Sequence, residues 1–356
     1  MNRRMILKRG LLAALGIAGG FTGHAYATNS YYGGPVSDHF DGTRFFIPGH
    51  PFESSPLRLL RWQFGEKAAP WPASWPSPFQ DKPPERIGAN DLRVTLIGHA
   101  SFLIQVAGKN ILVDPVYSDR ASPVSFAGPK RVNAPGINFD HLPPIDLVLV
   151  SHGHYDHLDV ATLFRLHQRM NPHVVTPLGN DTVIASSMGG KAQVTAYDWG
   201  QAHDAGGGVT IHLEPAYHWS ARGVLDRHKA LWCAFVITTP AGTIYHIADT
   251  GYADGQFFRT AAKKHGPIRL AIIPIGAYEP RWFMKGQHVN PEESVRIMQD
   301  CGVKNAIGHH WGTFQLTNEE IDQPEKDLAA ALAAAEIEAA RFQAFRPGQV
   351  WKSVTV

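Results

Sequence analysis

The hexapeptide His152–His157, which reads HGHYDH, constrains this chain more than any other segment. It directly follows the apolar stretch Asp146–Val150, which we expect to be a buried strand. His152 and His154 are two residues apart, so in extended backbone both side chains face the same way and can bind one ion. Asp156 and His157, where the chain turns into a helix, can face a second ion. The spacing therefore predicts a metal centre at a strand end.

One short loop cannot complete two metal sites, because a catalytic ion takes about three protein ligands and keeps an open position. Further ligand-type residues stand where other predicted strands end. They are His218 after Val209–Leu213, Asp249 after Thr243–Ile247, and His310 after Lys304–Ile307. Their positions predict one centre assembled from several strand ends.

The composition favours imidazole ligands over thiolates. The 356 residues include 19 histidines and two cysteines, and neutral imidazole suits zinc and similar metals. We expect Cys233 and Cys301 to be free thiols, with a single bridge between them as the alternative. The chain carries 33 basic and 31 acidic side chains, a net charge of +2. This balance argues against nucleic acid as a partner.

Residues 1–27 have the pattern of an export signal. The pair Arg3-Arg4 precedes an apolar run from Gly10 to Phe21, and Ala25-Tyr26-Ala27 offers a cleavage site. The start RRMILK resembles the twin-arginine motif. We predict cleavage after Ala27 and a periplasmic or otherwise exported protein, either soluble or membrane-associated. The alternatives are an ordinary secretory signal and an uncleaved N-terminal anchor.

The remaining chain divides into an arm, 28–90, and a catalytic domain, 91–356. The arm is dense in proline and aromatic residues, for example Trp71-Pro72 and Pro83-Pro84. Since each proline removes a backbone donor, we expect no regular helix or strand there. We expect the arm to wrap the domain, and it is the candidate surface for a homodimer.

Short apolar runs alternate with turn residues through the domain, and helical patterns close each half. Two runs of strands closed by helices suit an α/β fold with two sheets face to face. The expected strands are Arg93–Ile97, Phe102–Val106, Asn110–Val113, Asp146–Val150, Val209–Leu213, Leu231–Thr238, Thr243–Ile247, Leu270–Ile275 and Lys304–Ile307. The expected helices are Asp159–Met170, one beginning at Pro291 with Asn290 as its cap, and Glu325–Ala340.

With these residues in place, the sequence resembles the metallo-β-lactamase superfamily, whose motif is HxHxDH followed by His, Asp and His. The resemblance implies a four-layer αββα sandwich with two mixed sheets and outer helices. It also implies two divalent ions, zinc being favoured by the ligands. The first ion would take His152, His154 and His218, and the second Asp156, His157 and His310, with Asp249 bridging both.

Longer motifs narrow the resemblance to the N-acylphosphatidylethanolamine-hydrolysing phospholipase D family. The similarity spans roughly residues 90–345. The motifs are Asp114–Pro123, Gly128–Arg131, Leu142–Ile145, Ser151–Asp159, Ile273–Lys285, Gln287–Val289 and His310–Phe314. The implied activity is hydrolysis of N-acylphosphatidylethanolamine to N-acylethanolamine and phosphatidic acid by a metal-bridged hydroxide.

The family positions also suggest residue roles. Asp156, Asp249 and His288 would be catalytic, whereas Arg222, Gln287, His288 and Tyr278 would contact the substrate. Arg222 has the alternative of an ion pair, and Gln287-His288 that of orienting metal ligands. His99 resembles a histidine that lines the site in the wider fold, or is a core histidine. Arg281–Lys285 suits contact with a lipid interface, or packs inside the protein.

Two other functions stay open. The first is hydrolysis of a lactone or carboxylic ester on the same fold, since substrates vary on one scaffold. The second is a non-catalytic envelope protein that binds metal structurally. The expected partner is a phospholipid or another small ester, with peripheral membrane contact and without nucleic acid.

Overall fold

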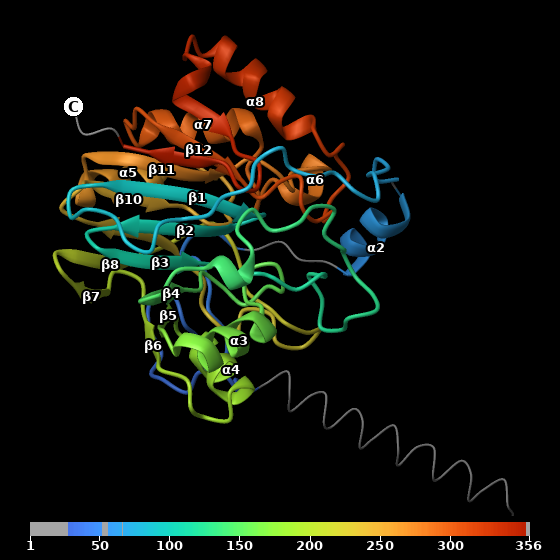
Figure 1. The fold of residues 1–356 in the computed structure, drawn as a ribbon. Helices are drawn as coiled ribbons and strands as arrows, with labels where there is room; N and C mark the ends of the chain where they lie inside the picture. Colours follow the sequence, from blue (N-terminus) through green and yellow to red (C-terminus); the bar gives the residue numbers. More distant parts are fainter. Residues whose placement is uncertain (1–27, 52–55, 66, 354–356) are drawn as a thin grey trace, which may run out of the picture.

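The computed structural model describes residues 28–51, 56–65 and 67–353 (Figure 1). The predicted export signal, 1–27, lies outside the described residues. Within the described part, no helix combines the length and the apolarity that crossing a bilayer requires.

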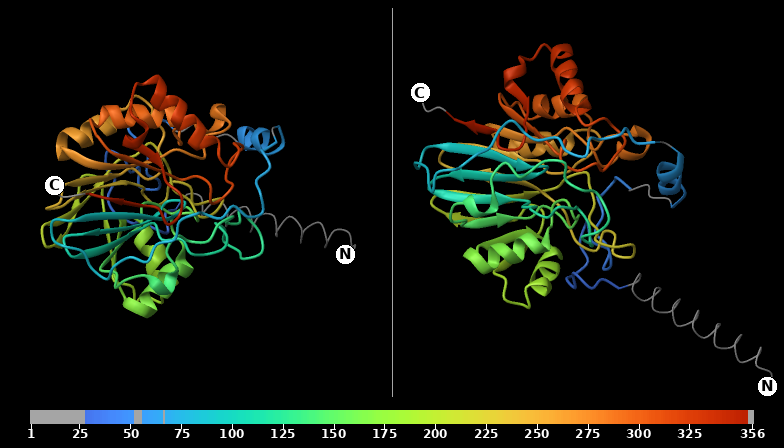
Figure 2. Two further views of the ribbon diagram at one scale, coloured as in Figure 1. Left: turned by 45° about the horizontal axis from the view of Figure 1, so that its top comes forward. Right: turned by 45° about the vertical axis from the view of Figure 1, so that its right-hand side comes forward.

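Two sheets face each other in the middle of the molecule, and each has seven strands within the described residues (Figures 1 and 2). In spatial order, the first comprises β14 (Val350–Lys352), β1 (Leu92–Gly98), β2 (Ser101–Val106), β3 (Lys109–Val113), β4 (Leu147–Leu149), β5 (His173–Pro177) and β6 (Val194–Tyr197). The second comprises β13 (Phe342–Ala344), β12 (Ala306–His309), β11 (Ile268–Pro274), β10 (Thr243–His246), β9 (Ala234–Thr238), β8 (Val209–Glu214) and β7 (Ala202–Gly206).

Both sheets are mixed. In the first, β14, β1, β2 and β3 pair antiparallel, and β3 to β6 pair parallel. In the second, β7 to β10 pair antiparallel, and β10 to β13 pair parallel. The β2–β3 hairpin turns at Ala107 and Gly108, which have φ angles of 50° and 72°. Both central residues of such a turn need positive φ.

Helices cover the outer face of each sheet (Figure 2). α3 (Val160–Met170) and α4 (Asn180–Ser187) pack on the first sheet, and α5 (Gln256–His265), α7 (Pro291–Asp300) and α8 (Gln323–Ala334) on the second. Short helical turns complete the set: η1 (Phe139–His141), α6 (Arg281–Met284) and η2 (Ala339–Arg341).

The apolar core forms three layers that match this arrangement. One cluster lies between the sheets, a second joins the first sheet to α3 and α4, and a third joins the second sheet to α5, α7 and α8. The four-layer αββα sandwich is therefore confirmed. Each predicted strand is present, with ends that differ by a few residues.

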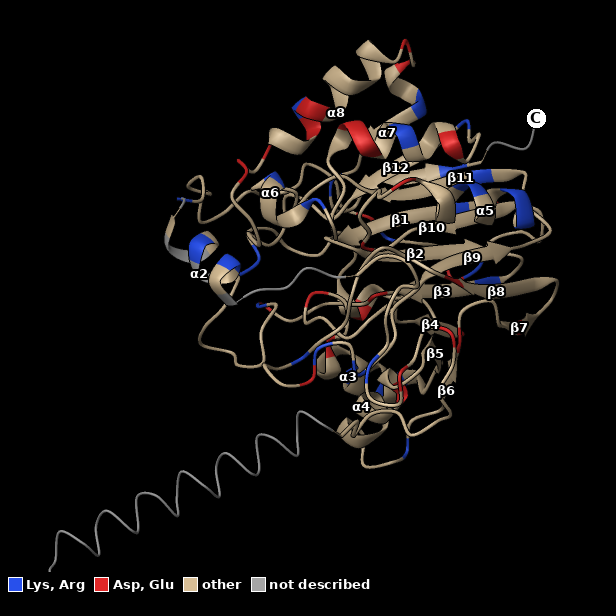
Figure 3. Cartoon of the chain, turned by 180° about the vertical axis from the view of Figure 1, so that it is seen from behind, with Lys and Arg blue, Asp and Glu red and all other residues tan. Residues whose placement is uncertain are grey.

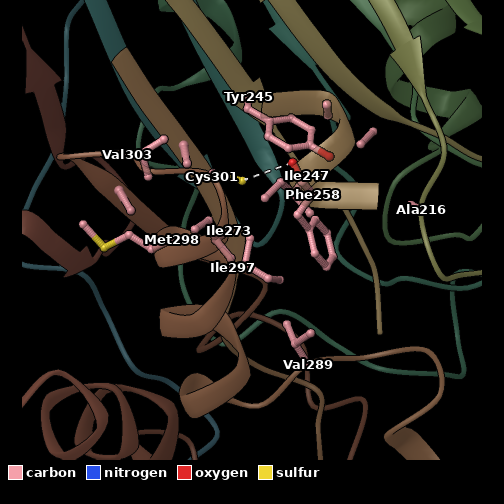
Figure 4. Close-up of a cluster of buried hydrophobic side chains, with 14 of the residues drawn as sticks. Ala216, Tyr245, Ile247, Phe258, Ile273, Val289, Ile297, Met298, Cys301 and Val303 are labelled. Carbon is pink, nitrogen blue, oxygen red and sulfur yellow. Dashed lines mark hydrogen bonds between the residues drawn. The ribbon is translucent and has the colours of Figure 1, made fainter. Parts of the chain in front are cut away.

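The third cluster also contains one of the two cysteines. Cys301 lies among Tyr245, Phe258 and Val303, with its Sγ 3.8 Å from the Phe258 carbonyl oxygen (Figure 4). Cys233 is buried between the sheets. Both are free, so the expectation of two thiols is confirmed.

The arm differs from its expected form in one place. The expectation of no regular helix is wrong for α2 (Pro56–Gly65). Its only proline, Pro56, is the first helical residue, where the missing N–H costs no helical hydrogen bond. The prolines that argued against a helix cluster after residue 69, and α2 itself is rich in leucine and arginine.

Other parts of the arm are built into the domain. Phe40 and Phe45 are each 1% exposed and belong to the third cluster. Asp81 accepts a hydrogen bond from the Arg93 guanidinium of β1 at 2.6 Å, and both side chains are buried. The arm is thus fastened by apolar packing at one end and by a buried ion pair at the other.

Candidate metal centre

Four loops that follow strands bring the seven predicted ligands together. The loop after β4 carries His152, His154, Asp156 and His157, and the loops after β8, β10 and β12 carry His218, Asp249 and His310. Every one of these residues except His154 is less than one tenth exposed. The centre therefore lies at one edge of the sandwich, where strands from both sheets end.

The first three histidines form a compact group. Nε2 of His152 lies 2.9 Å from Nδ1 of His154, and Nε2 of His218 lies 3.2 Å from the same atom. Ligand atoms of all three lie within 4.8 Å of one another. This spacing suits three ligands of a single ion.

A second group lies beside the first. Oδ2 of Asp156 is 3.5 Å from Nε2 of His157 and 3.3 Å from Nε2 of His310. His99 joins it, with its Nε2 2.9 Å from Asp156 Oδ2 and its ring centroid 4.0 Å from that of His310. His99 is therefore a residue of the site, positioned to orient Asp156 or to add a ligand.

Asp249 lies between the two groups. Its Oδ2 is 3.6 and 3.9 Å from Nε2 of His218 and His152, on one side. On the other side it is 3.2 and 3.3 Å from Nε2 of His310 and His157. One carboxylate oxygen thus has four imidazole neighbours drawn from both groups, which is the position of a bridging ligand.

The donor set fits divalent ions. Nε2 of His154, His157 and His310 and Oδ1 of Asp249 are buried and have no hydrogen-bond partner among the described residues. Buried polar atoms are normally satisfied, and imidazole with carboxylate is a donor set that zinc prefers. Cations at the two groups would satisfy these atoms.

The histidines of the centre fall into two groups, one with a lowered pKa and one with a raised pKa. Burial lowers the pKa of His152 and His218 well below the ordinary value and that of His154 to about 4, which keeps these imidazoles neutral. Burial opposes the charged form of His310 too, but Asp249 and Asp156 outweigh it and raise its pKa to about 9. The two carboxylates thus favour positive charge at this place, and divalent ions would supply it.

Asp114 forms hydrogen bonds to His157 and to Ser151, which precedes the predicted ligands. Its Oδ2 accepts a hydrogen bond from His157 Nδ1 at 2.8 Å and from Ser151 Oγ at 2.6 Å, and its Oδ1 accepts from Ser151 N at 2.7 Å. Hydrogen bonds of this kind hold a ligand ring in place and set its tautomer. Sequence reasoning missed this role, although Asp114 opens one of the family motifs.

Gln287 and His288 lie beside the first group. The Gln287 carbonyl oxygen accepts a hydrogen bond from His218 Nδ1 at 3.0 Å. His288 is 8% exposed, forms a group with His218 and Asp249, and has its pKa lowered to about 3 by burial. The backbone of Gln287 thus orients a predicted ligand, and the neutral imidazole of His288 faces the centre.

The other two predicted substrate contacts make different interactions. Arg222 Nη1 donates to the carbonyl oxygens of Gly153 and Leu158 at 2.9 and 2.8 Å, so it holds both ends of the loop that follows β4. Its guanidinium also lies 4.0 Å from the centroid of the Tyr155 ring. The Tyr278 hydroxyl donates to Asp327 of α8 at 2.5 Å.

A groove of about 520 Å³ opens next to the segment that leads into Gln287. Its lining combines apolar and cationic side chains, namely Ile47, Arg58, Tyr217, Phe283 and Lys285.

Comparisons with known proteins agree with this geometry. A family model described as "Beta-lactamase superfamily domain" matches residues 109–311. The chain is 38% identical over 275 residues to N-acyl-phosphatidylethanolamine-hydrolyzing phospholipase D 1 of Caenorhabditis elegans, across 74% of this chain and 76% of that protein. It is 34% identical over 238 residues to the mitochondrial enzyme of the same name from Saccharomyces cerevisiae, across 66% of this chain and 50% of that protein.

A solved structure shares the fold. It is the isothiocyanate hydrolase from Delia radicum gut bacteria, with a TM-score of 0.58 and 19% sequence identity over 73% of this chain and 98% of that one. At that identity the likeness concerns the arrangement of strands and helices.

Proposed function

We infer that this chain, which belongs to the N-acylphosphatidylethanolamine-hydrolysing phospholipase D family of the beta-lactamase superfamily, cleaves N-acylphosphatidylethanolamine. The protein is a metal-dependent hydrolase. The proposed products are N-acylethanolamine and phosphatidic acid. The proposal rests on the position of Asp249, whose Oδ2 has four imidazole nitrogens within 3.9 Å.

Such a carboxylate suits a centre of two ions, and zinc is the metal we propose. When bound, the two ions would activate water and neutralise charge on the phosphoryl group. The chain's own part is to hold them close together: Asp249 lies between the groups, Asp114 fixes the His157 ring, and the Gln287 carbonyl fixes that of His218.

Of the proposed substrate contacts, His288 has the most suitable position. It is neutral and buried beside His218 and Asp249, so it can donate or accept a hydrogen bond at the head group. Gln287 is adjacent to it. The guanidinium of Arg222 and the hydroxyl of Tyr278 are engaged with other groups, so we propose no direct phosphate contact for them.

Export and membrane contact remain proposals as well. The pattern of residues 1–27 supports a twin-arginine route, which carries folded proteins and suits an enzyme that acquires its metals before export. The substrate, a membrane lipid, would be met at a bilayer surface.

The test is incubation of the purified, metal-analysed protein with N-acylphosphatidylethanolamine, plain phosphatidylethanolamine and an acyl lactone, in parallel with Asp249→Ala. We expect N-acylethanolamine from the wild type only, with about two zinc ions per chain. Lactone cleavage without lipid cleavage would move the assignment to the ester hydrolases. Full metal occupancy with no turnover of any ester would favour a structural metal protein.

A further inference from the structure

The first residues of the described chain, 28–32, are bound to the loop 219–229, which begins directly after a predicted metal ligand. The Asn29 side chain makes the attachment. Its Nδ2 donates to the Lys229 carbonyl oxygen at 2.8 Å, and its Oδ1 accepts from the backbone N of Tyr31 at 2.8 Å. The amide therefore shapes the turn of its own segment, as asparagine commonly does, and also fastens that segment to the end of the loop.

Tyr31 reaches the middle of the same loop. Its hydroxyl donates to Asp226 Oδ2 at 2.7 Å. On the other side, its carbonyl oxygen accepts from Thr182 Oγ1 of α4 at 2.8 Å, and in Figure 1 the described chain indeed begins beside α4. Because the residue is held from two sides and half-buried, its hydroxyl has a fixed place opposite the carboxylate.

Asp226 organises the loop around it. Its Oδ1 accepts from the backbone N of Gly223 at 2.8 Å and of Arg222 at 3.2 Å, and its Oδ2 lies 3.1 Å from the latter N. It is the one acidic residue of the loop 219–229. In Figure 3, acidic and basic stretches lie together on the loops beside α3 and α4. Since hydrogen bonds to a carboxylate are strong, Asp226 determines where the backbone of residues 222–223 lies.

Arg222 continues these contacts to the loop that follows β4 and carries four of the predicted ligands, which we call the metal-binding loop. Its guanidinium donates to two carbonyl oxygens of that loop, as described above. Its own carbonyl oxygen accepts from the Tyr155 hydroxyl at 3.0 Å, and the neighbouring Ser220 Oγ accepts from Gly153 N at 3.0 Å. A series of hydrogen bonds thus runs from Tyr31 through Asp226 and Arg222 to the metal-binding loop.

We propose that Asn29 and Tyr31 are positioning residues of the metal centre, which act on the metal-binding loop through Asp226 and Arg222. The inference rests on the proposed function, because it names residues that hold the same centre in place. Outer partners of metal ligands restrict where those ligands lie and so raise metal affinity. The predicted cleavage after Ala27 would leave both residues in the mature protein. The simpler alternative is that their hydrogen bonds only attach the arm, and metal retention separates the two.

The first experiment measures zinc retention of the full chain in competition with a chromophoric chelator. Tyr31→Phe removes one hydroxyl, and Asn29→Ala removes the amide. We expect each variant to lose about threefold in zinc affinity, less than the tenfold or more that direct supports of ligands contribute. Tyr197→Phe is the matched control, since its hydroxyl pairs at 3.0 Å with His203 of β7, and it should retain zinc as the wild type does. Wild-type retention in Tyr31→Phe and Asn29→Ala would overturn the proposal.

A double variant tests the route of the effect. If Tyr31 acts through Arg222, then Tyr31→Phe should cause no further loss of zinc affinity in a protein that already carries Arg222→Met. Losses that multiply would show that the two residues act independently and would overturn the proposed series. Hydrogen exchange gives a readout without metal: the amides of residues 222–223 should exchange about fivefold faster in Tyr31→Phe, and those of β9 at the wild-type rate. Unchanged exchange at residues 222–223 would equally contradict the proposal.

The positioning role and the proposed substrate can fail separately, because neither zinc retention nor hydrogen exchange involves a substrate. The expected changes in a protein that releases no N-acylethanolamine would support the positioning role and reject the lipid substrate. Release of N-acylethanolamine by the wild type, together with wild-type zinc retention in Tyr31→Phe and Asn29→Ala, would do the reverse.

Discussion

Two roles can be proposed for Arg222: a contact with the substrate phosphate, and positioning of the loop that follows β4. Its place after His218 suggested a phosphate contact, but its guanidinium joins Gly153 to Leu158 and stacks on Tyr155. The side chain is largely buried, and burial lowers its pKa. Hydrogen bonds to both ends of the metal-binding loop point to a positioning role, because they restrict where the ligands of that loop can lie.

We predict that Arg222→Met weakens metal retention about tenfold, the lower end of what outer ligand supports contribute. Competition with a chelator measures this directly. Arg120→Met is the control, because Arg120 likewise donates to two backbone carbonyls, of Ser125 and Gly128, within its own loop. A raised KM with unchanged metal retention would instead favour the phosphate contact.

At the scale of elements, helix starts are where local sequence was most informative. The prediction of a helix beginning at Pro291 with Asn290 as its cap is confirmed. Asn290 Oδ1 accepts from Glu293 N at 3.0 Å, and Glu293 Oε2 accepts from Asn290 N at 3.2 Å, which completes a capping box. Glu293 also pairs with Arg281 of α6, so the cap connects the two helices that flank His288.

Asn290→Ala should therefore cost about 1 kcal/mol of unfolding free energy. The reason is that the first-turn N–H of Glu293 loses its side-chain acceptor. Urea denaturation of the protein measures the loss. Gln299→Ala, an exposed position on the same helix, should change stability by less than about 0.5 kcal/mol. Equal effects of the two substitutions would contradict the role of the cap.

Several elements were not predicted. β5, β6 and β7 and the helices α4 and α5 lie between the expected elements, and β13 and β14 are three-residue strands. β6 is half-buried along its whole length, without the alternation that marks a strand. The predicted helix Glu325–Ala340 begins and ends earlier, as Gln323–Ala334. Pairing with neighbouring strands, which local sequence does not reveal, stabilises these short elements.

At the scale of the whole molecule, the arm is held by a histidine between two carboxylates. His39 Nε2 lies 2.7 Å from Asp198 Oδ1, its Nδ1 lies 2.5 Å from Asp38 Oδ1, and its ring stacks on Trp199. Burial opposes the imidazolium, but the hydrogen bonds to Asp198 and Asp38 outweigh it and hold the pKa of His39 above its ordinary value of 6.5.

This contact makes stability depend on pH with a definite sign. Because the folded-state pKa is raised, the contribution is complete below the unfolded-state value, about 6.5, and is lost as pH rises through the folded-state pKa. The unfolding free energy of wild type should thus exceed that of His39→Gln most at low pH. Denaturation at a series of pH values measures the difference. Asp198→Asn should lose the same dependence, and a difference that does not vary with pH would refute the contact.

The predicted ligand set of this protein follows from local sequence, because ligand chemistry depends on residue type and on spacing along strands. HGHYDH, together with His218, Asp249 and His310, predicted the centre and the superfamily with its sandwich, whereas longer motifs such as Ile273–Lys285 were needed to predict the family. The direction of side chains depends on groups distant in the chain. Packing turned Arg222 to the backbone of the metal-binding loop and Tyr278 to α8, and placed Asp114 behind His157. Long-range contacts also set α2 against α6 and buried Phe40 in the core, since burial depends on the area that remote segments cover.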